Sequence, residues 1–347
     1  MISRSVPGVY RRRVTIQQVA QQLDLSTSTI SKALSKPQTV KPETVARVRK
    51  EVERLGYRPN SIAQELRMGS GNTVFVFLPS YRQSFLAALD GVEAAALALG
   101  YIVMTANVGS NPLRQMEYLD LACRGRAVGA IVISSDSLFA EHLHKANACP
   151  TVFAFNADRR RNIASVSIDY SLEAEKATRH LIELGHRRIG FVDSDEDDKC
   201  AKRRYRGYRM AMTSLRLEQM EVFSLADKCD CEGGRSAMQA LLKRENAPTA
   251  VFIGSDELSV GAIAAIRLAG LRVPEDISVV GFGDQVVGQL CDPPLTSVRL
   301  PALDIGYRAM INLDLILQGK SPYSPTILPC SLVTRDSTAR LLVQNSA

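Results

Sequence analysis

Apolar residues in the first sixty positions recur at helical spacing in three short bursts. A repeat of this kind predicts three amphipathic helices, each too short to be stable alone and each burying one face against the others. The members of the bursts are Ile16, Val19, Ala20 and Leu23; Ile30, Ala33 and Leu34; and Val45, Val48, Val52 and Leu55.

Signals for helix starts and ends flank these bursts. Thr15 and Gln18 fit a capping box, Ser26 is placed to cap the second helix, and Pro42 suits the first turn of the third, which Gly56 ends. Only Asp24 and Leu25 separate the first burst from the Ser26 cap, which is the spacing of a helix-turn-helix. In that motif the second helix enters the major groove, and its outward side chains here are Thr27, Ser28 and, one turn on, Lys32.

From Thr73 onward the pattern changes to short, continuous apolar runs that alternate with helical stretches. Runs of this kind indicate parallel strands buried on both faces, and about ten of them predict two doubly wound sheets. Ligands of such sheets bind beyond the carboxyl ends of the strands. The residues expected there are Pro79–Phe85, Asp169, Asp193–Arg204, Asp256 and Phe282–Asp284.

Charge is distributed unevenly along the 347 residues. Residues 1–72 contain 13 Lys and Arg against 5 Asp and Glu, a net charge of +8, whereas the rest of the chain is nearly neutral. A basic segment joined to a neutral body is typical of a nucleic-acid-binding module. A basic disordered tail is the alternative, but it would lack the apolar bursts.

Several classes of protein fit the sequence poorly. No stretch is long and apolar enough to span a bilayer and residues 1–13 do not resemble a signal peptide, so we expect a cytoplasmic protein without membrane contact. Seven irregularly spaced cysteines favour reduced thiols, and Cys229 and Cys231 have no second ligand pair, so neither a metal nor another cofactor is expected. Gly281 and Gly283 do not complete a dinucleotide fingerprint, and an enzyme is not expected.

Residues 14–67 resemble the DNA-binding headpiece of the lactose-repressor type (LacI/GalR) family of transcriptional regulators. The resemblance rests on Val-Thr-Ile-Gln-Gln-Val-Ala (14–20), Leu-Ser-Thr-Ser-Thr-Ile-Ser-Lys-Ala-Leu (25–34) and Leu-Gly-Tyr-Arg-Pro-Asn-Ser-Ile-Ala-Gln-Glu-Leu (55–66). It implies that Thr27, Ser28 and Lys32 read base edges. Other positions implied to contact DNA are Thr15, Ser31, Ser35, Tyr57, Asn60 and Ala63.

Residues 60–67 resemble the family's hinge helix, which orders on DNA in the minor groove. Leu66 matches the leucine that wedges between the central base pairs, and the Gly- and Ser-rich segment that follows gives it no core to enter. The headpiece also departs from the family pattern. Asp24 replaces the usual glycine of the turn, and Lys32 replaces the commoner arginine.

The stretches 178–207 and 250–300 resemble the effector domain of the same family. Arg204 falls on the family's effector-binding arginine, and Asp256 and Asp284 fall on or beside its polar contacts. Gly283 replaces a frequent acid. The first loop is atypical, with Gln-Ser-Phe-Leu at 83–86, although Phe85 remains a candidate to stack on a ligand.

The sequence therefore predicts an all-α headpiece (1–59), a hinge and linker (60–72), and a periplasmic-binding-protein-like α/β domain (73–347) of two subdomains. Their expected boundaries are about 73–170 with 299–326, and 171–298 with 327–347. We expect a homodimeric repressor that binds a pseudo-palindromic operator in double-stranded DNA under control of a small-molecule effector such as a sugar or sugar acid. The alternatives are a DNA-binding regulator that has lost ligand sensing and a periplasmic sugar-binding protein, which would have no use for a basic headpiece.

Overall fold

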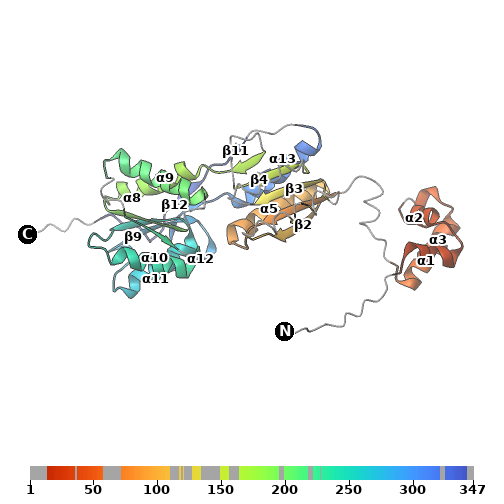
Figure 1. Cartoon of the computed structure of the whole chain (residues 1–347), viewed down its shortest axis with the longest axis horizontal. Helices are drawn as coiled ribbons and strands as arrows, with labels where there is room; N and C mark the ends of the chain where they lie inside the picture. Colours follow the sequence, from red (N-terminus) through yellow and green to blue (C-terminus); the bar gives the residue numbers. More distant parts are fainter. Residues whose placement is uncertain are drawn as a thin grey trace, which may run out of the picture. The chain divides into compact units, whose positions relative to one another are not determined.

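The computed structural model divides the chain into two compact units, Met1–Gly71 and Asn72–Ala347 (Figure 1). The residues that it describes are 14–35, 37–57, 72–109, 117–118, 120, 127–133, 149–155, 164–194, 199–217, 222–226, 228–320 and 325–341.

The first unit contains the three helices that the apolar bursts predict. They are α1 (Ile16–Leu23), α2 (Thr27–Ser35) and α3 (Pro42–Leu55), with a short 3-10 turn η1 (Pro37–Thr39) before α3. Each helix contributes two residues to one buried core, consisting of Val19, Ala20, Ile30, Ala33, Val45 and Val48. We call this unit the headpiece.

The predicted start signals of α1 and α2 are confirmed. Thr15 forms the capping box, with its backbone N–H donating to Gln18 Oε1 at 2.8 Å while Gln18 N–H donates to Thr15 Oγ1. Ser26 Oγ accepts from the backbone N–H of Thr29 at 3.1 Å. These contacts satisfy amide groups that have no partner within the helix.

The turn between α1 and α2 is made by Asp24, which has a φ of 53° and ends α1 in the left-handed conformation. Aspartate tolerates this conformation better than most residues, so the turn forms without the glycine that the family usually has there. The guanidinium of Arg47 on α3 donates to the carbonyl oxygen of Leu23 at 3.4 Å and ties the third helix to the turn.

The second unit contains two six-stranded sheets. The first has the order β11-β5-β4-β3-β1-β2 and, with helices α5 (Gln83–Leu99) and α13 (Ala302–Leu317), forms what we call the first lobe. Its strands are β1 (Thr73–Leu78), β2 (Ile102–Asn107), β3 (Gly129–Ile133), β4 (Thr151–Ala154), β5 (Ser165–Ser167) and β11 (Thr326–Ile327). All its strand pairs are parallel.

The second sheet has the order β12-β10-β9-β8-β6-β7. Its strands are β6 (Ile189–Ser194), β7 (Val222–Ala226), β8 (Ala250–Ile253), β9 (Ser278–Gly283), β10 (Thr296–Arg299) and β12 (Ser331–Val333). In Figure 1, α8 (Tyr170–Glu183) and α9 (Lys199–Ser214) cover one face, and α10 (Cys231–Leu242) and α11 (Asp256–Leu268) cover the other. With the short helix α12 (Val286–Leu290), these elements form the second lobe.

The predicted fold class, a helical headpiece with two doubly wound sheets, is confirmed. The edge strand β12 differs from the parallel pattern because it pairs antiparallel with β10. The chain passes between the lobes after β5, after β10 and after β11. Each lobe is therefore built from separated parts of the sequence, and the second sheet ends in a strand that arrives from the other lobe.

Within the described ranges, no helix is both long and apolar enough to cross a membrane. The cysteines of those same ranges form no disulfide with one another.

Candidate DNA-binding and effector-binding sites

The outer face of α2 carries the three predicted base-reading residues. Ser28 and Lys32 are exposed and Thr27 is half-buried, whereas Ile30 and Ala33 are fully buried on the opposite face. The α-helical period of 3.6 residues therefore places the polar side chains away from the core. Helix α2 is thus held by apolar contacts on one side and presents hydrogen-bonding groups on the other.

The other residues that the resemblance implies to contact DNA have different surroundings in the headpiece. Ser35 donates through its hydroxyl to the carbonyl oxygen of Ser31 at 2.8 Å, and Thr15 is engaged in the α1 cap. Tyr57 packs partly buried against the headpiece core. The predicted contacts at 60, 63 and 66 (Asn60, Ala63 and Leu66) lie outside the described residues.

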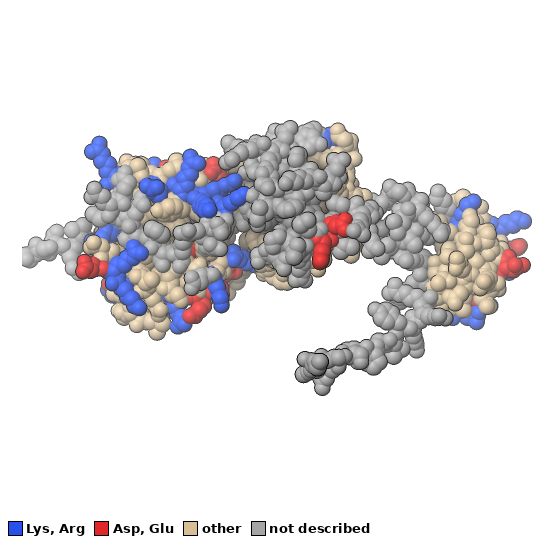
Figure 2. Space-filling model, in the orientation of Figure 1, with Lys and Arg blue, Asp and Glu red and all other residues tan. Residues whose placement is uncertain are grey.

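Figure 2 shows Lys and Arg side chains around the edge of the headpiece, with fewer Asp and Glu on the same face. A surface of this kind attracts phosphate groups, and it does so independently of base sequence. Attraction to phosphate alone therefore does not distinguish one base sequence from another.

In the second lobe, Arg204 of α9 forms a two-point ion pair with Asp193 of β6. Arg204 Nε donates to Asp193 Oδ2 at 2.8 Å, and Arg204 Nη2 donates to Asp193 Oδ1 at 2.9 Å. Asp193 is fully buried and Arg204 is 7% exposed. The backbone N–H of Ser194 also donates to Asp193 Oδ1, at 2.8 Å. Such a two-point pair is the strongest geometry available to a carboxylate and a guanidinium.

The carboxylate of Asp193 occupies space that Gly254 leaves open at the end of β8. A Cβ on Gly254 would lie 2.2 Å from Asp193 Oδ2, so any larger residue would displace the carboxylate. Two aromatic rings complete the surroundings: the guanidinium carbon of Arg204 is 5.8 Å from the ring centre of Tyr170 and 5.4 Å from that of Phe282. These distances are typical of cation–π contacts.

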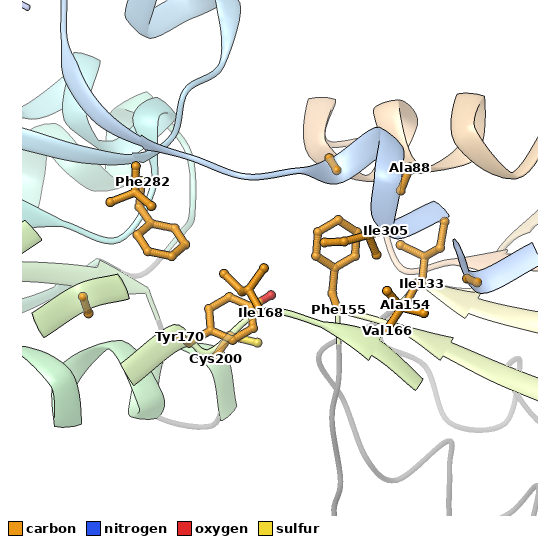
Figure 3. Packing of buried hydrophobic residues seen from close by; sticks show 14 of the residues in the cluster. Ala88, Ile133, Ala154, Phe155, Val166, Ile168, Tyr170, Cys200, Phe282 and Ile305 are labelled. Atoms are coloured by element: carbon orange, nitrogen blue, oxygen red, sulfur yellow. The ribbon is translucent and has the colours of Figure 1, made fainter. Parts of the chain in front are cut away.

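The two rings belong to one buried apolar cluster that includes residues of both lobes. Figure 3 shows Tyr170 and Phe282 on the second-lobe side of this cluster and Phe155 with Ile305 on the first-lobe side. Tyr170 and Phe282 stack on each other with ring centres 6.0 Å apart. We call Arg204, Asp193, Gly254, Tyr170 and Phe282 the Arg204 cluster.

Asp256, at the first position of α11, is fully buried. It accepts hydrogen bonds from Ser297 Oγ at 2.6 Å and from the backbone N–H of Gln285 at 2.5 Å. Burial raises the pKa of Asp256 to about 6; the two hydrogen bonds oppose this rise, and nearby Asp284 adds to it.

Asp284 lies in two ion pairs. Arg299 Nε donates to its Oδ2 at 2.6 Å, and Arg335 Nη2 donates to its Oδ1 at 2.5 Å. Its backbone, with a φ of 52°, follows Gly283, whose φ of 140° suits glycine alone. Because both carboxylate oxygens bind arginines of the same chain, Asp284 joins β9 to β10 and to the C-terminal segment.

The predicted first-lobe candidate, Phe85, packs edge-on against Phe155 with ring centres 5.5 Å apart and is partly buried in the apolar cluster. Two residues earlier, Gln83 Oε1 accepts a hydrogen bond from the backbone N–H of Val286 at 3.1 Å. The atypical loop thus meets the second lobe at α12, and Phe85 takes part in the core.

The carboxyl ends of the neighbouring strands β6, β8 and β9 bring Asp193, Asp256 and Asp284 to one edge of the second sheet, where Arg204 pairs with Asp193. Phe85 is not brought to these charged groups by any of its contacts with described residues and packs against Phe155 instead. The strand pattern places Asp193 in the range expected beyond the strand ends, but it does not predict that Asp193 pairs with Arg204. Neither Arg335 nor the Tyr170 ring is predicted from the sequence.

A surface groove of about 620 Å³ lies elsewhere, on the outer side of α8 and α9. It contains Arg179, Arg206 and Met210 but none of the predicted effector residues. We place no ligand there, because the converging buried polar groups lie at the strand ends instead. Among the described residues, no group of three His, Cys, Asp or Glu is arranged to hold a metal ion.

Comparison with known proteins identifies both parts of the chain. Residues 15–60 match the model of bacterial regulatory proteins of the lacI family, and residues 178–338 match that of a periplasmic binding protein-like domain. Catabolite control protein A of Priestia megaterium is 32% identical, over 94% of this chain and 99% of the relative. The HTH-type transcriptional repressor CytR of Escherichia coli K12 is 31% identical, over 94% of this chain and 97% of the relative.

Solved structures agree with this assignment. A lac repressor dimer bound to operator and the anti-inducer ONPF has the same fold, with a TM-score of 0.82 at 24% identity over 94% of this chain and all of that one. A complex of the transcriptional regulator CelR with cellobiose has a TM-score of 0.70 at 26% identity, with the same coverage. The chain therefore belongs to the lacI family of bacterial regulatory proteins and is a DNA-binding transcriptional regulator.

Proposed function

We propose that this regulator represses transcription by inserting α2 into the major groove of its operator, with Thr27, Ser28 and Lys32 toward the base edges. The observation that carries this proposal is the two-sided character of α2, buried at Ile30 and Ala33 and polar on its outer face. Lysine prefers guanine O6 and N7, whereas serine and threonine are less selective.

The remaining headpiece residues position the protein on the phosphate backbone. Ser31 and Ser35 on α2, Thr15 at the start of α1 and Tyr57 after α3 supply hydrogen-bonding groups suited to this role. The contacts of Asn60, Ala63 and Leu66 in the minor groove are proposed from the sequence alone. In that arrangement Leu66 wedges between base pairs at the centre of the operator.

The regulator acts as a homodimer in the cytoplasm, and it binds rather than catalyses. One helix-turn-helix reads only half a site, so a two-fold dimer requires a pseudo-palindromic operator. The related lac repressor structure is a dimer on operator DNA, which supports this arrangement. Sedimentation that shows a stable monomer or a tetramer would rule it out.

A small-molecule effector controls DNA binding from the second unit, bound at the strand ends near Arg204 of α9 and Asp256 of α11. The complex of CelR with cellobiose supports ligand binding by a related regulator. The competing proposal is a regulator that no longer senses a ligand. It is favoured by the ion pairs of Arg204 and Asp284, which already occupy two of the three charged candidates.

The test begins with selection of an operator from random duplex DNA by the full-length protein, followed by fluorescence anisotropy on that operator. A metabolite panel is then screened by thermal shift, and each hit is added to the DNA titration. We expect a two-fold symmetric operator and at least one metabolite that changes its affinity tenfold or more. Failure to select a sequence contradicts sequence-specific binding, and an operator that no metabolite affects favours the regulator without ligand sensing.

A further inference from the structure

The predicted effector arginine is already neutralised inside the chain. Asp193 takes two donors of the Arg204 guanidinium, at 2.8 and 2.9 Å, and accepts a third hydrogen bond from the backbone of Ser194. The missing side chain of Gly254 provides the space in which the carboxylate lies. Asp193 therefore occupies the position in which an anionic ligand would meet this guanidinium.

An anion that approached Arg204 would have to compete with a carboxylate that cannot leave. Asp193 is fully buried on β6, which has a neighbouring strand on each side, so displacing its partner would leave a negative charge unpaired in the interior. The incoming anion would also lie within a few ångströms of that charge, which opposes binding further. The positive charge of Arg204 is therefore already balanced and is not available to attract an anionic ligand.

Among the described residues, two buried side-chain atoms at this edge of the sheet have no hydrogen-bond partner, and both are acceptors. No donor among the described residues reaches Gln285 Oε1, although Gln285 is only 7% exposed, and none reaches Glu257 Oε2 in the first turn of α11. The Gln285 amide lies near the end of β9, since a Cβ on Gly283 would be 3.5 Å from Gln285 Nε2. A buried acceptor without a partner favours a ligand that donates.

These observations point in the same direction. Carboxylate and phosphate groups are negatively charged and offer hydrogen-bond acceptors. They would find the charge of Arg204 already balanced by Asp193, and they could not donate to Gln285 Oε1 or Glu257 Oε2. A hydroxyl-bearing molecule without negative charge supplies hydrogen-bond donors to these acceptors and does not need an unpaired arginine.

We infer that Asp193 is a built-in counter-ion of Arg204 and that the effector is an uncharged, hydroxyl-rich molecule of the neutral sugar or nucleoside class. This inference rests on the proposed effector control. The sequence predicts that the effector is a sugar or a sugar acid, and this inference excludes the sugar acid.

The experiment measures whether Arg204 becomes available to anions when Asp193 loses its charge. Thermal unfolding of the full-length protein is followed with inorganic phosphate and with gluconate, at constant ionic strength set by sodium chloride. The variants are Asp193→Asn, Arg204→Met and the double variant Asp193→Asn/Arg204→Met. Asp276→Asn is the matched control, because it removes the carboxylate from an exposed ion pair with Arg272.

Phosphate and gluconate should raise the unfolding midpoints of the wild type and of Asp276→Asn no more than they raise that of Arg204→Met. Asp193→Asn should gain about 2 °C or more in midpoint with 20 mM phosphate, and the double variant should lose that gain. Anion binding to the basic headpiece is common to all the variants, so it cancels in this comparison.

The inference is overturned if Asp193→Asn gains nothing, or if the wild type is stabilised by phosphate or gluconate in a manner that Arg204→Met abolishes. Should Asp193→Asn fail to fold, calorimetry on the wild type decides with two matched pairs, glucose against gluconate and ribose against ribose 5-phosphate. Binding of either acid that depends on Arg204 overturns the inference, and binding of neither supports it. None of these measurements uses operator DNA, so their outcome is separate from that of the effector-control test.

Discussion

Ser297 donates a 2.6 Å hydrogen bond to Asp256, and neither side chain is exposed to solvent. One bond from a neutral hydroxyl and one from the Gln285 backbone do not offset the loss of water around this carboxylate. Its pKa is therefore raised to about 6. The same contacts hold the start of α11 against β10, so the ionisation of Asp256 is coupled to the stability of the second lobe.

The first prediction concerns pH. Because the folded pKa of Asp256 exceeds the unfolded value of 3.8, the folded state binds more protons between these two values, and the contribution of Asp256 to stability falls as pH rises toward 6. From pH 5 to pH 7, the unfolding free energy of the wild type should fall by about 1 kcal/mol relative to that of Asp256→Asn. Any hydrogen bond lost by asparagine adds an offset that does not depend on pH.

Urea unfolding at several pH values measures this difference. Asp276→Asn serves as the control, because its exposed ion pair with Arg272 lowers the pKa of Asp276 and gives no change of this sign. A difference between wild type and Asp256→Asn that stays constant from pH 5 to pH 7 would contradict the raised pKa.

The second prediction concerns the headpiece turn. Asp24 has a φ of 53°, a conformation that costs a residue with a Cβ about 1 kcal/mol and costs glycine almost nothing. Asp24→Gly should stabilise the headpiece and slow amide exchange in α1 and α2 by about two- to fivefold in the full-length protein. Asp24→Ala keeps the Cβ and should give no such slowing, so equal exchange in the two variants would refute the explanation.

Local signals predicted the headpiece well because its helices are specified by residues close in sequence. Thr15 and Gln18 are three positions apart, and Asp24 acts on its own backbone. The Arg204 pair could not be predicted in this way, since Asp193 becomes its partner only when α9 folds back across β6. The ion pair of Asp284 with Arg335 joins residues that are 51 positions apart. Periodicity places strands and helices, but it does not specify which charged side chains meet at the strand ends.

The third prediction concerns the packing that places Arg204. A Cβ on Gly207 would lie 2.0 Å from the carbonyl oxygen of Ser171, so α9 and α8 touch through their backbones. Gly207→Ala must push the helices apart and should destabilise the second unit by about 1–3 kcal/mol, the usual cost of overpacking. Arg206→Ala, an exposed change on the same helix, should alter stability by less than about 0.5 kcal/mol in chemical unfolding. If alanine at 207 is as harmless as alanine at 206, the close approach of the helices is wrong.

The fourth prediction concerns the hinge. If Leu66 wedges between base pairs, it is desolvated only on DNA that the protein bends, and Leu66→Ala should weaken operator binding by about 1–3 kcal/mol. Affinity for random DNA, which depends on phosphate contacts, should stay within a factor of two. Electrophoretic bending assays should show a smaller bend for the variant. A normal bend with full operator affinity would exclude the wedge.

The last prediction separates base reading from simple charge attraction. Lys32 is exposed on α2 and Lys50 is exposed on α3, so each alanine substitution removes one positive charge from the same headpiece. If Lys32 contacts a base, Lys32→Ala should cost about 1–3 kcal/mol at the selected operator and relax the preference at one symmetric pair of positions. If Lys32 instead contacts a phosphate, Lys32→Ala should weaken binding to all sequences alike and reduce the salt dependence of binding by about one counterion per subunit.

Lys50→Ala is the matched control, and it should follow this second pattern or have no effect. Anisotropy titrations on the operator and on each of its symmetric base changes, at three salt concentrations, distinguish the two patterns. If Lys32→Ala lowers every affinity by the same factor, α2 does not read bases through Lys32, and the outward face of this helix must gain its selectivity from Thr27 and Ser28.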